Sequence, residues 1–466
     1  MIRRILSLFT GLLLCGIVVP WAVWAQEPAV QEPRRISPDE AVSLAIKNNL
    51  GLESARATTD GKKRKSDLSW NQFIPSVTLG GSLVRDNEVS KGTTINLPPA
   101  MGGPVTLGGD APQWHVAGSV QASLTINAAM FENMRRLRLD YQGGLVSYEK
   151  ARAQMEKDVR KSYYNMLLIR ENIALLRESF NTAQRRVETA QANYNAGLAP
   201  ELTLLQARVA MENMKPTIDQ TENGLKLSMA QFAMNLGLPY DTLFELIPPD
   251  EALAFIPLDT AEMISKAASG KPDILELKQN ILMLQSARRA QIFSLTPSLS
   301  LSWNTSPAFI GDPWEDDWGN EDLWQKSGSL TISLGLRVHS LLPFSTDFQA
   351  VKDLDDNIKA ANIGLAQMVR GTEIEIYNTV LSLEKTQTTA EAQQQTVKLA
   401  EQSYSLTEEA YRAGLQDLLE VQNAELSLRQ ARVQMLEQQF NYLNGLIDLE
   451  YAIGVPFGTL SSKGSK

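Results

Sequence analysis

Few side chains in this sequence are placed for covalent or metal chemistry. The two histidines, His115 and His339, stand far apart, and neither has a companion at a metal-ligand spacing. No glycine-rich phosphate loop and no GxSxG nucleophile motif occurs. The sequence therefore predicts a protein that is not an enzyme and holds neither a cofactor nor a metal. One acidic stretch could attract a divalent cation but lacks the spacing of a calcium loop. A solvated loop is the preferred interpretation of these residues, which are Asp312, Glu315, Asp316, Asp317, Glu321 and Asp322.

More informative residues belong to a glycine turn that occurs twice. Residues 194–207 have the sequence YNAGLAPELTLLQA and residues 411–424 have YRAGLQDLLEVQNA, so that Gly197 and Gly414 are 217 positions apart. Leu198 and Leu415 follow them at the same interval. Glycine suits a position where a helix ends with positive φ and the chain reverses. Either turn alone could be a simple helix stop, and it is the repetition that suggests a shared function.

The first residues are typical of a secretory signal peptide. Two arginines precede an apolar run that ends in small residues, which predicts cleavage after Ala25 and removal of residues 1–25. A retained membrane anchor is the alternative, although the run is short for a span of about 20 residues. Cys15, the only cysteine, raises the possibility of lipidation, but Leu14 before it argues against that. Removal of the two arginines would change the formal charge from −9 to −11, which disfavours nucleic acid as a partner.

The duplication extends well beyond the two turns. The stretch from Ile36 matches the stretch from Leu258 at a shift of 222, and LGLP at 236–239 matches IGVP at 453–456 at a shift of 217. Each half is predicted to contain a short helix, a strand pair, a long helix, the glycine turn and a shorter helix. The bounds that follow are a first repeat over 26–245, a linker over 246–257, a second repeat over 258–456 and a tail over 457–466.

The predicted long helices carry an apolar seam. Residues 130–194 contain no proline, and a single helix of that length would extend for about 100 Å. Sustained steps of three and four are typical of a coiled coil, with an ordinary amphipathic helix as the alternative. Pro216 should kink or break the helix predicted over 200–236. The seam residues are Met166, Ile169, Ile173, Leu176, Phe180, Ala183, Val187, Ala190 and Tyr194, with Val397, Ala400, Tyr404, Thr407 and Tyr411 in the second copy.

The two strand regions, about 72–127 and 295–339, alternate apolar and polar residues. Strands are expected to include 77–84, 120–126 and 330–338, each with one wet face. The six tryptophans outside the signal peptide fall in or beside these strands, which is typical of an interfacial aromatic girdle. A soluble sandwich with buried tryptophans is the alternative. The tryptophans are Trp70, Trp114, Trp303, Trp314, Trp318 and Trp324.

Membrane strands impose a constraint on assembly. A sheet edge exposed to lipid leaves backbone groups unpaired, at a cost of several kcal/mol for each group, so the sheet must close. Four strands are too few to close around anything, and two chains would give eight strands whose interior is filled by side chains. Three chains would give twelve strands and room for a lumen.

The sequence resembles the TolC-type outer-membrane efflux proteins. The resemblance is carried by ISPDEAVSLAIKNN near the start, by the two glycine turns and by the LGLP and IGVP endings, in the right order over nearly the whole chain. It implies a mainly α-helical fold with membrane strands, in which a homotrimer shares one twelve-stranded barrel in outer-membrane lipid. A periplasmic α-helical coiled-coil tunnel would continue the barrel. The implied partners are a periplasmic adaptor (membrane fusion) protein and an inner-membrane transporter.

The resemblance also assigns roles to residues at the turns. Gly197, Leu198, Gly414 and Leu415 would form the tips that dock with the adaptor. Glu420 takes the position of one acidic residue that lines the closed entrance in the family, whereas Asn423 takes the place of the second. Gln416 stands where the family has a basic residue that helps to hold the entrance closed, so other partners such as Asp417 would have to serve. Without the family, Glu420 would be interpreted as an ordinary surface glutamate.

These inferences predict a passive exit duct in the outer membrane, with its helical part in the periplasm, for drugs, toxins, metals or proteins. The alternative from another class is a structural coiled-coil envelope protein or adhesin that conducts nothing. A diffusion porin fits less well, because it would need many more strands and far less helix.

Overall fold

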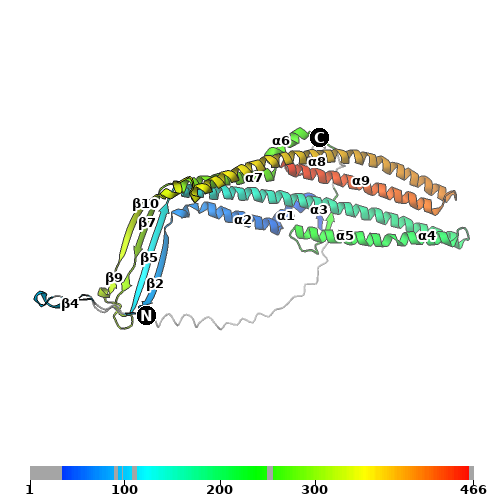
Figure 1. Ribbon diagram of the computed structural model, residues 1–466. Coiled ribbons are helices and arrows are strands. Elements are labelled where there is room, and N and C mark those ends of the chain that lie inside the picture. The colour runs from blue at the N-terminus through cyan, green and yellow to red at the C-terminus, as the bar shows by residue number, and fades with distance from the viewer. Residues whose placement is uncertain (1–33, 89–92, 97, 108–112, 249–254, 461–466) are drawn as a thin grey trace.

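The computed structural model of the chain describes residues 34–88, 93–96, 98–107, 113–248 and 255–460. The predicted signal peptide with Cys15 lies outside the described residues, as do parts of the linker over 246–257 and of the tail over 457–466. The molecule is elongated, with a sheet at one end and long helices that run away from it (Figure 1). Within the described ranges, no helix combines the length and the hydrophobicity that a bilayer crossing needs.

Four long strands form the sheet. They are β2 (Ser76–Arg85), β5 (Trp114–Ile126), β7 (Ser298–Thr305) and β10 (Gly328–Gly335). Every neighbouring pair is antiparallel, and the order across the sheet is β10, β7, β5, β2. The short strands β8 (Ala308–Phe309) and β9 (Trp324–Gln325) extend the second hairpin beside β5, and β3 (Thr93–Asn96) pairs with β4 (Pro104–Leu107) in a separate hairpin. Within the described residues, β2 and β10 each have one unpaired edge.

The register sorts side chains between the two faces of the sheet. One row across the four strands consists of Leu330, Trp303, Ala122 and Val77, and the next row along consists of Thr331, Ser302, Ser123 and Ser76. The alternation continues through the rows near the helices, so that one face carries aliphatic residues and the other carries Ser, Thr, Asn and Gln. At the outer end of β2 and β5 it is weaker, since Val84 and His115 lie on the polar face and Arg85 on the apolar face. Within the part of the chain that the structure describes, no second sheet covers the apolar face, since Leu79 and Leu334 are 75% and 76% exposed.

Most of the tryptophans are also exposed, which excludes the soluble sandwich with buried tryptophans. Trp70, Trp303, Trp314 and Trp318 are between 45% and 71% exposed. At the end of the sheet far from the helices, Phe309 stacks on Trp318 at a centroid distance of 5.0 Å and contacts Trp324 at 5.4 Å. Phe309 pairs with Val116, so this aromatic cluster continues the apolar face of the sheet.

One predicted strand is shorter than expected. β10 ends at Gly335, and a 3₁₀ turn over Val338–Leu341 follows in place of a strand that reaches position 338. The chain must turn there from the sheet into a helix. Buried Ser340 fixes that turn, because its hydroxyl donates to Asp347 and its carbonyl oxygen accepts a hydrogen bond from Ser345.

Two very long helices organise the rest of the molecule. α3 (Ala129–Asn195) and α8 (Thr346–Arg412) each contain 67 residues, and their first residues are 217 positions apart. α2 (Leu50–Asp67), α4 (Glu201–Glu212) and α5 (Met214–Asn235) lie along α3, and α7 (Pro272–Phe293) and α9 (Leu418–Ile453) lie along α8 (Figure 1). α7 and α9 also contact α3, so the helices form one wall in the order α2, α3, α7, α8. The predicted mainly helical fold with four long strands is confirmed, and the two-fold duplication stays a prediction.

Two predicted helices are divided. Asn49 separates α1 (Pro38–Asn48) from α2, and its side chain accepts a hydrogen bond from the N–H of Leu52 at 3.0 Å. The helix predicted over 200–236 divides at Asn213, which places Pro216 in the first turn of α5. A proline in the first turn costs little, because its missing N–H would have had no partner within the helix.

The middle of the wall carries a small packed layer. β1 (Arg34–Ile36) pairs in parallel with β6 (Phe244–Leu246), and α6 (Thr260–Gly270) packs on α8 and α9. The hydroxyl of Tyr163, on α3, lies 2.7 Å from the carbonyl oxygens of Ile36 and Ile247, which ties this layer to the wall. Burial raises the pKa of Tyr163 to about 12, so the hydroxyl keeps its proton.

The start of the C-terminal tail is held by a buried carboxylate. Glu450 is 2% exposed and accepts hydrogen bonds from the N–H groups of Gly458 and Leu460 at 2.9 and 2.7 Å. Burial raises the pKa of this carboxyl group, although the two backbone hydrogen bonds oppose the shift.

The glycines at the helix ends fall into two classes. Gly237 and Gly454 have φ of 70° and 68°, and an added Cβ would lie 2.1 Å from the carbonyl oxygens of Asn48 and Gly270. Gly197 and Gly414 have φ of 73° and 75°, but nothing lies within 4 Å of a Cβ built there. Glycine is therefore required at positions 237 and 454 by both backbone conformation and packing. At positions 197 and 414 it is required by backbone conformation alone.

We predict that Gly237→Ala or Gly454→Ala lowers the apparent Tm well beyond Gly197→Ala or Gly414→Ala. A left-handed alanine costs about 1–2 kcal/mol at all four sites, and only the first pair adds a backbone clash. Thermal unfolding of the purified variants provides the measurement. Equal losses in the two pairs would contradict the packing argument.

Candidate functional site

The two glycine turns lie together at the end of the helical part, away from the sheet (Figure 1). At the first turn, the N–H of Leu198 donates to the carbonyl of Asn193 at 2.8 Å, and at the second the N–H of Leu415 donates to that of Ala410 at 2.8 Å. Both turns thus close their helix in the same way, with a left-handed glycine and a hydrogen bond that spans five residues.

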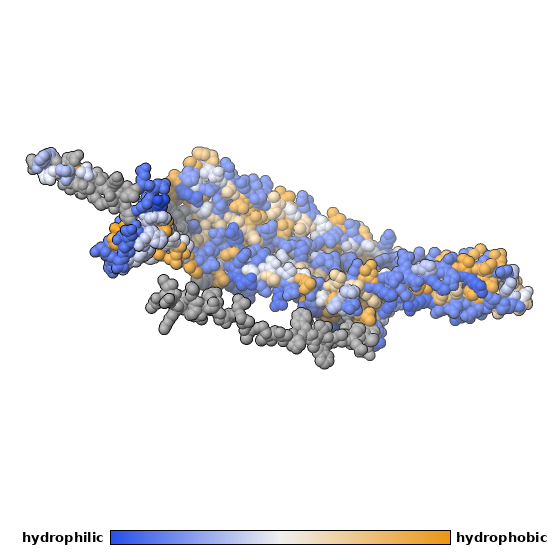
Figure 2. All heavy atoms as spheres, turned by 90° about the horizontal axis from the view of Figure 1, so that it is seen from below, coloured by the Kyte–Doolittle hydropathy of each residue, from blue (hydrophilic) through white to orange (hydrophobic). Residues whose placement is uncertain are grey.

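Each turn presents leucine to solvent. Leu198 and Leu415 are both 79% exposed, and Leu202 and Leu419, again 217 positions apart, are 63% and 55% exposed. The view from below also shows hydrophobic residues gathered towards this end of the helices (Figure 2). An exposed leucine at the tip of a hairpin gains about 1.5–3 kcal/mol when a partner buries it.

The two hairpins contact each other near their tips. Leu418, the first residue of α9, is 4% exposed and packs with Ala190, Leu204 and Ala207 of the first hairpin. The two tips are therefore held in a fixed relation.

One of the predicted entrance residues already has a structural role. Asp417 is the N-cap of α9 and accepts a hydrogen bond from the N–H of Glu420 at 3.1 Å. Glu420 is exposed one turn into the helix, and Asn423 is exposed one turn further on. Gln416 is exposed in the turn itself. Among the described residues, none of these four side chains forms an ion pair, and their part in an entrance stays a prediction.

Two arginines that no sequence pattern indicated link the hairpins. Arg186 on α3 forms an ion pair with Glu425 on α9, and these side chains are only 14% and 18% exposed. The same guanidinium donates to the hydroxyl of Tyr404 on α8 at 2.9 Å. Burial raises the pKa of Tyr404, although the nearby Arg186 opposes the shift.

Arg432 makes a second link further from the tips. Arg432 belongs to α9, and it contacts Glu401 of α8 at 2.9 Å and Glu178 of α3 at 3.4 Å. Tyr404 was predicted as a seam residue, but no pattern in the sequence indicated its hydrogen bond with Arg186. The ionic partners could not be found from spacing because Arg186 and Glu425 are 239 positions apart.

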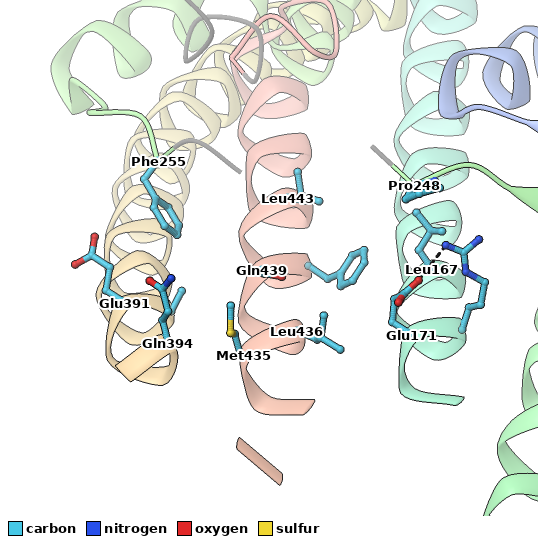
Figure 3. A pocket seen from close by; sticks show the side chains of 13 residues that line it. Leu167, Glu171, Pro248, Phe255, Glu391, Gln394, Met435, Leu436, Gln439 and Leu443 are labelled. Carbon is cyan, nitrogen blue, oxygen red and sulfur yellow. Dashed lines mark hydrogen bonds and ion pairs between the residues drawn. The ribbon is translucent and has the colours of Figure 1, made fainter. Parts of the chain in front are cut away.

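A pocket of about 470 Å³ lies between α3, α8 and α9 (Figure 3). Its floor is apolar, with Leu167, Phe440 and Leu443, and its rim carries Glu171 and Glu391. Arg170 of α3, which also lines the pocket, forms an ion pair with its neighbour Glu171 at 3.0 Å, whereas Glu391 lies on α8. Across the described residues, no three acidic, histidine or cysteine side chains lie close enough together to hold a metal ion.

The residues considered for metal chemistry are used locally or separated. In the acidic loop, Asp312 accepts a hydrogen bond from the N–H of Trp314 at 2.8 Å, and Asp317 accepts one from Gly319 at 2.9 Å. His115 lies 3.4 Å from Asp86 at the outer end of the sheet, whereas His339 lies in the turn at its helical end. These two carboxylates thus stabilise their own loop.

Comparisons with known proteins identify a family model and solved structures that match this chain. A family model described as outer membrane efflux protein matches residues 41–237 and 349–455. The solved structure of CusC, whose description concerns folding and transmembrane channel formation, has 17% identity and a TM-score of 0.71, with 93% of this chain and 96% of that chain covered. The CmeC outer membrane channel of Campylobacter jejuni has 17% identity and a TM-score of 0.70, with coverage of 92% and 88%. The open state of the MtrE outer membrane channel of Neisseria gonorrhoeae has 15% identity and a TM-score of 0.64, with coverage of 90% and 89%.

We predict that Arg186→Ala loosens the two hairpins near their tips. The substitution leaves Glu425 largely buried without its partner, which costs about 3–5 kcal/mol. We expect faster hydrogen exchange of the last turns of α3 and the first turns of α9. Arg412→Ala is the matched control, because its partner Glu408 is on the same helix and Arg412 is 74% exposed. Unchanged exchange in the Arg186 variant would show that the ion pair does not hold the hairpins together.

Proposed function

Because the chain belongs to the outer membrane efflux protein family, we propose that it is the outer-membrane exit duct of a tripartite efflux or secretion system. It acts as a homotrimer, conducts substrates passively, and receives them from a periplasmic adaptor and an inner-membrane transporter. The duct itself carries out no chemical reaction.

The observation that carries this proposal is the incomplete sheet. β2 and β10 present unpaired edges of ten and eight residues, and one face of the sheet is apolar and exposed. In lipid, each unpaired backbone group costs several kcal/mol, so the edges must find partners. β2 and β10 run in opposite directions, and β2 of one copy can therefore pair with β10 of the next in the antiparallel manner of the whole sheet.

The helical wall has matching open edges. α8 exposes large apolar residues at steps of 7, 11 and 18, which keeps them on one face. The other edge, formed by α4 and α5, exposes a comparable set. Since α8 follows β10 and the opposite edge lies on the side of β2, one rotation between copies closes the sheet and the wall together. The residues are Ile363, Ile374, Leu381, Leu399 and Leu406 on α8, and Leu202, Leu205, Val209, Leu227 and Met234 on the other edge.

The polar face of the sheet suits a passage. Ser, Thr, Asn and Gln form the rows nearest the helices. The two rows that contain Ser76 and Gln121 have no charged residue. A wet but neutral lining would not select strongly by charge, and the choice of substrate would then be made by the pump.

The tips supply the contact with the adaptor. Three copies would present six leucine-bearing turns at the periplasmic end, all with the same backbone geometry. The turns are exposed, apolar and rigid, and such a surface can bind a helical hairpin at little cost in ordering.

Conductance in a planar bilayer tests the proposal. Purified protein should behave as a trimer and open to a conducting state, at least after Glu420→Gln. A stable monomer, or a trimer in which no substitution at the entrance produces conductance, would instead support the structural envelope protein.

We predict that the combined variant Leu198→Asp and Leu415→Asp abolishes export. Each buried leucine is worth about 1.5–3 kcal/mol, and three copies multiply that loss. Drug or substrate accumulation in cells gives the measurement, with trimer yield and bilayer conductance unchanged. Met101→Asp is the control, since Met101 is 72% exposed at the opposite end of the molecule. Export that persists in the double variant would rule out docking through these tips.

We further predict that Glu420→Gln lowers the preference of the channel for cations over anions. Threefold symmetry would bring three Glu420 carboxylates together, and their removal takes away a cation-attracting ring. Reversal potentials in a salt gradient measure this preference. Glu437→Gln is the control, because Glu437 is exposed further along the same helix and on a different face. The assignment fails if both variants shift the potential equally.

A further inference from the structure

A repeated pattern marks the place where the helices meet the sheet. Each of the four helix ends has an aromatic residue near the junction and a basic residue four or seven positions further from the sheet. In α3, α7 and α8 this spacing places the two on the same helix face, whereas Trp70 lies in the 3₁₀ turn that follows α2. The pairs are Trp70 with Lys63, Phe131 with Arg135 and Arg138, Phe293 with Arg289, and Phe348 with Lys352. We name these basic residues the neck belt.

The neck is positively charged in an acidic protein. Residues 56–70, 129–140, 285–297 and 336–359 contain thirteen Lys or Arg and eight Asp or Glu, a surplus of five positive charges. The formal charge of the whole chain is −9, so the rest of the chain must be strongly acidic.

Of the five neck-belt residues, Arg135 and Arg289 form ion pairs with Glu132, and the other three form no ion pair among the described residues. Lys63 and Arg138 are exposed, and among the described residues neither has an ion-pair partner. The ammonium of Lys352 is also exposed and lies 5.3 Å from the ring centroid of Phe348. Two of the aromatic residues are exposed as well, Trp70 at 54% and Phe131 at 63%, whereas Phe348 is half-buried.

We propose that the neck belt binds the phosphate groups of anionic phospholipids in the periplasmic leaflet of the outer membrane. The inference rests on the proposed function, because it requires the apolar face of the sheet to lie in the bilayer. Aromatic rings at the end of that face would occupy the interface. Basic groups four to seven helical residues further on lie about 6–10 Å deeper towards the periplasm, at the level of the headgroups.

Charge complementarity selects an anionic lipid. A zwitterionic headgroup carries its own positive charge and gains little from a cationic surface. Each Lys or Arg near an anionic surface contributes about 1 kcal/mol, and the effect fades within about 10 Å at moderate ionic strength. The belt would thus recruit anionic lipid around the neck and set the depth of the duct in the membrane.

The test compares lipid selectivity in reconstituted protein. The full chain is inserted into phosphatidylcholine vesicles, and the association of spin-labelled phosphatidylglycerol is compared with that of spin-labelled phosphatidylcholine. The variant combines Lys63→Gln, Arg138→Gln and Lys352→Gln. The control combines Lys226→Gln, Lys385→Gln and Lys398→Gln, three exposed lysines in the helices far from the neck.

We expect the natural chain and the control to prefer phosphatidylglycerol, and the preference to weaken as salt is added. In the neck variant the preference should fall by up to about fivefold for each neutralised side chain. No preference in the natural chain, an unchanged preference in the neck variant, or an equal loss in the control would each overturn the proposal.

A second measurement separates this proposal from the proposed function. Conductance is recorded in the same vesicles. If the protein conducts but shows no lipid preference, the belt is refuted and the duct stands. If the protein fails to insert as a trimer in any of these vesicles, the duct itself is refuted. Loss of export in the neck variant without a change in lipid preference would point to an acidic protein partner and would also overturn the lipid proposal.

Discussion

The structure depends on one constraint, which is that a single chain leaves every layer open at its sides. The sheet ends in the unpaired edges of β2 and β10, and the helical wall ends in apolar stripes on α8 and on α4 and α5. Strand order and helix order agree, because α2 leads into β2, β5 into α3, α7 into β7 and β10 into α8. The same rotation can therefore satisfy hydrogen bonds in the sheet and bury apolar surface in the wall. The hydrophobic effect drives the closure of the helices, whereas backbone hydrogen bonding enforces the closure of the sheet in lipid.

Helix length and helix termination follow from the need for a continuous wall. α3 and α8 run for 67 residues without an internal break, and shorter helices lie beside them in pairs. The shorter helices must stop where the middle layer begins, and Gly237 and Gly454 let the chain turn there against Asn48 and Gly270. The tips have no such packing requirement, since the space around Gly197 and Gly414 is open. Open space beside a rigid turn leaves room for another protein to approach the backbone closely.

Much of this arrangement could be predicted from the sequence, because it depends on periodic patterns and on glycine. The seam residues Met166, Ile173 and Ala190 are buried as expected, and the long helix begins and ends within one residue of its prediction. In α8, the counterparts Leu383 and Ala390 of Met166 and Ile173 are also buried. Val397 and Tyr404 are half-buried, as are their α3 counterparts Phe180 and Val187. The ion pair of Arg186 with Glu425 could not be predicted, since it joins residues of two hairpins whose relative register no local pattern encodes. The role of Asp417 was also missed, because a helix that starts after a turn of uncertain length does not reveal its N-cap in advance. Whether Glu420 and its neighbours line an entrance depends on other copies of the chain and remains a proposal.

The distribution of charge follows the same axis as the fold. The polar face of the sheet is made of neutral side chains, the neck has a surplus of positive charge, and the loops beyond β8 carry acidic residues that bind their own backbone. The net charge of −9 does not reveal this distribution, because it is the sum over regions of opposite charge. Each region meets a different physical requirement, since a neutral lining limits the trapping of charged solutes and a basic neck matches anionic headgroups. Acidic loops keep the outer end soluble. Under the proposed function, this segregation of charge would let one uninterrupted wall contact lipid, water and a partner protein at different heights without a change of fold.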